Sequence, residues 1–171
     1  MANDFLIHLT GICALVLNVL AIVKTCERSL RLQSGVAGLV WALNNLLLGA
    51  HSAAALSLVS AGRTASSAAT LRSGEARRRL AFVGFASLTL LVSALTWQGW
   101  LSAMLVGASL LSTYAMFYMQ GSRLRWVMLL VSMLWMANAW SYGSWEQVAA
   151  NAVTALAALY GAWRAGRASL A

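Results

Sequence analysis

The sequence consists of long apolar runs separated by short polar connections, and most of the runs approach the length that crosses a bilayer. A spanning α-helix requires about 20 mostly apolar residues. The runs occupy residues 5–23, 32–49, 53–71, 80–97, 100–119, 126–142 and 148–163. Only 9% of the residues are charged, against about 25% in soluble domains. We therefore predict an all-α polytopic membrane protein with seven transmembrane helices, whose first partner is the lipid bilayer.

Basic residues follow every second run. They are Lys24, Arg28 and Arg31 after the first run, Arg72, Arg77, Arg78 and Arg79 after the third, Arg123 and Arg125 after the fifth, and Arg164 and Arg167 after the last. Cytoplasmic connections are enriched in Lys and Arg, so we expect the N-terminus outside and the C-terminus in the cytoplasm. The run 53–71 has low hydropathy, and a six-span alternative leaves it as a surface helix. That alternative does not keep the basic connections on one side of the membrane, which favours seven spans.

The excess of 12 Lys and Arg over 4 Asp and Glu is explained by this orientation, and we expect no nucleic-acid partner. The first run has no basic residue before it, which predicts a retained helix rather than a cleaved signal. No Cys/His cluster has metal-ligand spacing, and no set of acids or nucleophiles lies within the runs. We therefore expect no metal, no cofactor and no enzymatic activity.

An offset of 94 residues aligns the first three runs with the last three. Arg31 then meets Arg125, Trp41 meets Trp135, Asn44 meets Asn138, and Gly49 meets Gly143. Coincidence in a biased composition is the alternative reading. A genuine repeat predicts a 3+1+3 plan: a three-helix unit over 1–76, a linker helix over 77–97 and a second unit over 98–171. Both units then point the same way, as in transporters with parallel repeats.

The third run of each half is rich in Ala, Ser and Gly. Small side chains let helices approach closely in lipid. We therefore expect the helix at 53–71 to lie between the first two helices, and the helix at 148–163 to lie between the fifth and sixth.

Several polar or bulky residues fall in the interior of the runs and are candidates for substrate binding. Trp41 and Trp135 are predicted at mid-membrane, either as core residues or as stacking platforms for a ligand ring. Amides in hydrocarbon need partners, which are either neighbouring helices or a ligand. Arg63 is a charge well inside a run, with snorkelling, an ion pair with Glu27 or Glu75, or a substrate contact as its alternatives. The predicted substrate-binding set is Trp41, Asn44, Ser57, Arg63, Trp135, Asn138 and Asn151.

The predicted architecture resembles the SWEET and SemiSWEET sugar transporters and the wider PQ-loop superfamily. Trp135 and Asn151 lie sixteen residues apart, a spacing similar to that of the Trp–Asn pair that lines the sugar pocket in that family. Trp41 and Ser57 have the same spacing, so the first half lacks the Asn. The Pro-Gln motif that names the superfamily is absent, because the chain has no proline.

A second resemblance covers most of the chain and points to the YgjV-like bacterial inner-membrane family. It is carried by short motifs: Arg28 and Arg31, Leu47-Leu48-Gly49, Arg63-Thr64, Leu134-Trp135, Asn138, and Gly143-Ser144. This resemblance implies a multi-pass protein of the bacterial inner (plasma) membrane, and it implies no particular activity.

These patterns together predict a transporter-like protein. It moves a small neutral metabolite, such as a sugar, through a cavity between the two halves, by alternating access. The alternative is a receptor or assembly protein with the same fold. A wet cavity lined by Trp41, Trp135 and Asn151 favours transport, whereas a dry interface there favours the alternative. A homo-oligomer is compatible with both.

Overall fold

A computed structural model describes residues 2–22, 27–70, 73–119 and 121–168 of the chain. Within these residues the chain consists of helices joined by short turns and has no strand, which confirms the all-α prediction. The helices, in chain order, are α1 (Ala2–Ile22), α2 (Glu27–Leu47), α3 (His51–Thr70), α4 (Glu75–Leu95), α5 (Trp100–Tyr118), α6 (Gly121–Ser141) and α7 (Trp145–Ala168).

Most helices extend beyond the apolar runs that predicted them. Helix α4 begins at Glu75 and includes Arg77, Arg78 and Arg79, although the apolar run begins at residue 80. Hydropathy marks the part of a helix that contacts acyl chains, whereas backbone hydrogen bonding continues through the polar headgroup region. Lys24, Cys26 and Arg72 lie outside the described residues, as do the side chains of Glu27, Arg28, Arg164 and Arg167.

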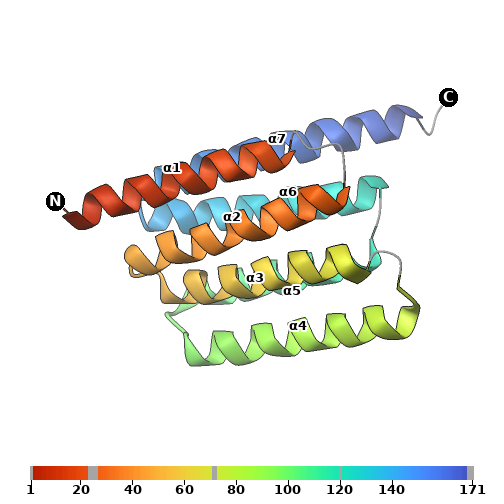
Figure 1. Cartoon of the computed structure of the whole chain (residues 1–171), viewed down its shortest axis with the longest axis horizontal. Helices are drawn as coiled ribbons and strands as arrows, with labels where there is room; N and C mark the ends of the chain where they lie inside the picture. Colours follow the sequence, from red (N-terminus) through yellow and green to blue (C-terminus); the bar gives the residue numbers. More distant parts are fainter. Residues whose placement is uncertain (1, 23–26, 71–72, 120, 169–171) are drawn as a thin grey trace.

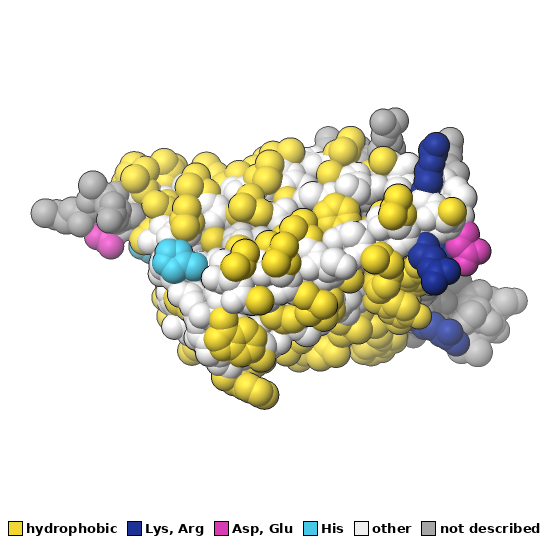
Figure 2. All heavy atoms as spheres, turned by 90° about the horizontal axis from the view of Figure 1, so that it is seen from below, with side chains coloured by type: hydrophobic (Ala, Val, Ile, Leu, Met, Phe, Trp, Pro, Cys, Tyr) yellow, Lys and Arg dark blue, Asp and Glu magenta, His cyan; other side chains and the backbone are white. Residues whose placement is uncertain are grey.

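The surface of the described bundle is apolar over much of its area. Large side chains such as Leu91, Leu95 and Leu156 are more than half exposed. On the face shown in Figure 2, Lys and Arg side chains gather at one end of the bundle and a histidine lies toward the other. By length and composition, three of the described helices are able to cross a membrane: Asp4–Ala21 within α1, all of α4, and all of α5. This surface is the one expected for a protein in contact with lipid.

The seven helices form two rows closed at one end by α4 (Figure 1). One row is α1, α2 and α3, and the other is α7, α6 and α5. The rows meet where α1 packs on α7 and where α3 packs on α5. Helix α4 packs on both α3 and α5, and Phe85 of α4 lies against Gly62 of α3 and stacks on Phe117 of α5.

Helix α3 lies inside the bundle, with more than half of its residues buried, so it is not a surface helix. Its predicted position between the first two helices is wrong, because α2 lies between α1 and α3. The predicted central position of the seventh helix is also wrong, because α7 packs on α6 and α1 and α6 lies between α5 and α7. The small residues instead allow neighbouring helices to approach each other closely. A Cβ added at Gly38 of α2 would lie 3.0 Å from the Cβ of Ala61.

The turns after α2 and α6 have the same backbone geometry at positions 94 residues apart. Gly49 and Gly143 have φ angles of 74° and 68°, a conformation that favours glycine. The amide of Gly49 donates to the Leu46 carbonyl and that of Ala50 to the Asn45 carbonyl. The equivalent bonds run from Gly143 to Trp140 and from Ser144 to Ala139. This pair of bonds is the Schellman motif that ends a helix, and it fixes each helical hairpin in the same shape.

Candidate functional site

The two interior tryptophans lie in separate apolar clusters, each at a junction between the rows. Trp41 is buried against Ala14 of α1 and Ala150 of α7. Trp135 is partly buried and packs on a cluster from α3 and α5 that contains Leu56 and Leu105. Residues 56 and 150 are 94 positions apart, so each indole contacts the equivalent position of the opposite row. The structure therefore gives each tryptophan its own cluster, and their predicted convergence on one pocket stays a prediction.

The amides of α2 hold the first row together. Asn44 is fully buried, and its Nδ2 donates to the Ile7 carbonyl at 2.7 Å and to Thr10 Oγ1 at 3.0 Å. Its Oδ1 accepts a hydrogen bond from Ser144 at 3.3 Å, which ties the first row to the α6–α7 turn. The neighbouring Asn45 donates to Ser57 Oγ at 3.2 Å. Asn44 and Ser57 are thus partnered by the protein itself.

The amides of the second row are less well satisfied. Asn138 is 1% exposed, and its Nδ2 has no hydrogen-bond partner among the described residues. Asn151 is partly buried and donates to the Gln147 carbonyl of its own helix at 2.9 Å. Among the three asparagines predicted as site residues, Asn138 is therefore the one whose side-chain NH₂ group has no described acceptor.

Arg63 is a buried cation, 3% exposed, and it reaches from α3 to α5. Its Nη1 donates to the Ser109 carbonyl and to Thr113 Oγ1, each at 2.9 Å, and its Nη2 donates to Ser60 Oγ at 2.6 Å. All of these described partners are neutral, and the side chain of Glu75 is exposed at the start of α4. An arginine at the centre of a transmembrane helix costs about 3 kcal/mol on insertion scales. The arrangement thus retains a positive charge in the interior without a described acidic partner.

Arg63 belongs to a layered contact surface between α3 and α5, which we call the α3–α5 seam. An outer polar layer, at the end of the seam away from the basic residues of α4, consists of Ser52 and Ser102, whose hydroxyl oxygens are 2.9 Å apart. An apolar layer of Leu56, Leu105 and Trp135 follows. The arginine layer of Ser60, Arg63, Ser109 and Thr113 comes last. Eleven residues separate Ser52 from Arg63, which is about 16 Å along a helix.

Sequence reasoning identified Arg63 and Trp135 but missed most of the seam. Ser52, Ser102, Ser109 and Thr113 are all buried, and none was a predicted site residue. The spacing of the hydroxyl residues along α5 was an available signal, because positions 102, 109 and 113 recur on one face of a helix. A hydroxyl-bearing face in an otherwise apolar helix needs a polar neighbour.

The second contact between the rows, which we call the α1–α7 seam, has a related outer end and a different interior. His8 Nδ1 lies 2.6 Å from Glu146 Oε1, and these residues are 94 positions from Ser102 and Ser52. The positions that match Arg63, Ser109 and Thr113 are Ala157, Leu15 and Val19, all apolar. The two seams therefore have polar pairs at equivalent positions of their outer ends. Among the described residues, the arginine layer occurs in the α3–α5 seam and not in the α1–α7 seam.

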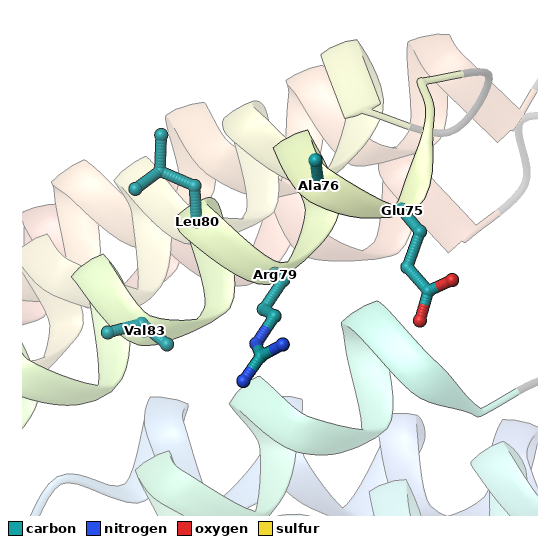
Figure 3. A pocket seen from close by; sticks show the side chains of 5 residues that line it. All are labelled: Glu75, Ala76, Arg79, Leu80 and Val83. Carbon is teal, nitrogen blue, oxygen red and sulfur yellow. The ribbon is translucent and has the colours of Figure 1, made fainter.

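A hollow on the surface lies apart from both seams, at the start of α4. Its described lining is Glu75, Ala76, Arg79, Leu80 and Val83, with the Glu75 and Arg79 side chains on the same side of the helix (Figure 3). These residues lie on the exposed surface at the basic end of the bundle. Such a position suits contact with lipid headgroups rather than enclosure of a substrate.

Comparison with known protein families gives a match over nearly the whole chain. The model of a family described as bacterial inner membrane protein, Imp-YgjV, matches residues 5–169. No curated protein and no solved structure matches the chain.

Proposed function

Because the chain belongs to the Imp-YgjV family of bacterial inner membrane proteins, we propose that it moves a small polar metabolite across that membrane, between its two rows of helices. The observation that carries the proposal is the α3–α5 seam, which has polar layers on both sides of an apolar layer. Its buried hydroxyls and Arg63 supply hydrogen bonds in the interior of a bundle whose surface is apolar. A helix bundle that only has to stay folded in lipid does not need a charge there.

The proposal includes a 3+1+3 plan with seven spans. It is supported by the duplicated turns at Gly49 and Gly143 and by the placement of α1 on α7 and α3 on α5. Two rows that meet in this way are related by an axis along the helices, the arrangement of parallel-repeat transporters. Helix α4 is the linker that restores the direction of the second row. The resemblance to SWEET and SemiSWEET proteins rests on this plan.

Labelling of single cysteines tests the topology. In a variant without native cysteines, we expect Cys at His51 and Gln98 to react with a membrane-impermeant maleimide in intact cells. Cys at Gly74 and Arg123 should react only after the membrane is opened, because these positions share the basic end. All four positions are exposed in the structure. Reaction of Gly74 and Gln98 from the same side would contradict a spanning α4.

Transport itself is tested in proteoliposomes. We expect at least one small polar solute from a panel of glucose, glycerol and methanesulfonate to enter faster than in protein-free liposomes. A leucine at Ser109 should slow this entry, because Ser109 is buried in the α3–α5 seam. The matched control is Gly107→Leu on the same helix, where an added side chain has open space and should leave entry unchanged.

Two results would reject the transport proposal. One is entry no faster than in protein-free liposomes for every solute, from protein that retains its melting temperature. The other is equal entry for Ser109→Leu and Gly107→Leu, which would show that the solute takes another path. The first result supports the receptor or assembly role instead, and the second rejects the α3–α5 seam as the path.

A further inference from the structure

We infer that the arginine layer is a binding site for one small monoanion, such as a carboxylate or sulfonate group, and that the transported metabolite is therefore anionic rather than neutral. The site is inferred from the contacts of Arg63. The inference about the metabolite rests additionally on the proposed transport function.

The first argument is the charge balance of the layer. The guanidinium of Arg63 is buried and donates to two hydroxyl oxygens and one carbonyl oxygen. These neutral acceptors orient the cation but do not neutralise it. A single negative charge would do so, and buried charges in proteins are usually paired.

The second argument is that donor groups remain available at the same place. Arg63 Nε and Ser109 Oγ are both buried and have no hydrogen-bond partner within the described residues. They belong to two residues already in contact through the Ser109 carbonyl. Both groups donate hydrogen bonds, and the planar guanidinium matches the geometry of carboxylate, sulfonate and phosphate oxygens. An anion is the ligand that accepts from both.

The third argument comes from the α1–α7 seam. In this seam the positions equivalent to Arg63, Ser109 and Thr113 are occupied by Ala157, Leu15 and Val19. The outer ends of the two seams both carry a polar pair. Leu15 and Ala157 are partly buried there, Val19 is 39% exposed, and Thr154 stands at the position equivalent to Ser60. The buried cation is therefore a feature of the α3–α5 seam that is not repeated at the equivalent positions of the α1–α7 seam.

The surroundings favour anions at the basic end of the bundle. Arg31 of α2 is also buried and donates to Ser67 Oγ at 2.8 Å, one helical turn along α3 from Arg63. Exposed Arg77 and Arg79 lie at the start of α4. Charges of one sign along a path raise the local concentration of the opposite ion. We therefore expect anions to gather at this end of the bundle, which is the predicted cytoplasmic side.

Binding is tested with methanesulfonate, which keeps its charge at every practical pH, on the full-length protein in an uncharged detergent. We expect methanesulfonate to raise the melting temperature in a saturable way at constant ionic strength. Neutral dimethyl sulfone, which is similar in size, should have no such effect. In Ser109→Ala the apparent affinity should fall by about tenfold, the loss of one charge-assisted hydrogen bond. Ser112→Ala, equally buried and with its described hydrogen bond to the Ser109 carbonyl of its own helix, should match the wild type.

Arg63→Gln should abolish the methanesulfonate effect, and Arg63→Lys should retain part of it. If Arg63→Gln does not fold, the comparison of Ser109→Ala with Ser112→Ala decides. Equal stabilisation by methanesulfonate and dimethyl sulfone would overturn the inference, and so would identical affinities of the two serine variants. Stabilisation by short-chain phosphatidylglycerol alone would also overturn it, because the bound anion would then be a lipid headgroup.

Transport assays separate this inference from the proposed function. Methanesulfonate binding without entry into proteoliposomes would confirm the site and reject transport. Entry of glucose at equal rates in wild type and Arg63→Gln, without methanesulfonate binding, would support transport and reject the anion site.

Discussion

Leu105→Ala is expected to lower the free energy of unfolding by about 2–5 kcal/mol, the range for large-to-small changes in a packed core. Leu105 is 1% exposed and packs with Leu56 and Trp135 in the apolar layer of the α3–α5 seam. The layer separates the outer polar layer from the arginine layer. The cavity left by the substitution joins these polar layers, so we also expect solute entry into proteoliposomes to increase several-fold.

The control for this change is Leu91→Ala on α4, whose side chain is 59% exposed and faces the surroundings of the bundle. It should change neither stability nor solute entry appreciably. Unfolding can be followed by denaturant titration in bicelles, and entry by light scattering. If solutes enter no faster through Leu105→Ala than through the wild type, the apolar layer is not the barrier to solute entry.

Asn44→Ala is expected to destabilise the protein by about 1–3 kcal/mol, because it leaves buried polar partners unsatisfied. Thr10 and Ser144 each lose a hydrogen bond with Asn44, and so does the Ile7 carbonyl. The substitution removes the link among α1, α2 and the α6–α7 turn. Melting temperature and chemical unfolding measure the loss.

Asn138→Ala is the matched control, at the equivalent position of α6 and equally buried. Its Nδ2 has no partner among the described residues, so its removal should cost much less than removal of Asn44. Equal losses for the two variants would contradict the assignment of the stabilising bonds to Asn44. A loss of methanesulfonate binding in Asn138→Ala would instead place that amide at the ligand.

The helical class and the number of helices were predictable because a bilayer allows few alternatives for such apolar runs. Helix ends were predictable where a glycine marks them, as at Gly49 and Gly143. The neighbours of α3 and α7 were predicted wrongly, since small residues show that a helix approaches another closely but do not show which one. Arg63 was recognised as an interior charge from its position in a run. Its partners Ser109 and Thr113 lie on another helix, so no local spacing connects them to it.

In the proposed seven-span arrangement, the position of α4 has a consequence for the membrane itself. An arginine that faces hydrocarbon draws water and headgroups inward, and the bilayer thins around it. Here α4 packs on both α3 and α5, and Phe85 lies between Gly62 and Phe117, so aromatic rings stand on the lipid side of this helix pair. The acyl chains beside α4 meet leucine and phenylalanine instead of a guanidinium. In this arrangement the lipid next to α4 can keep its full thickness, because the charge of Arg63 does not face it.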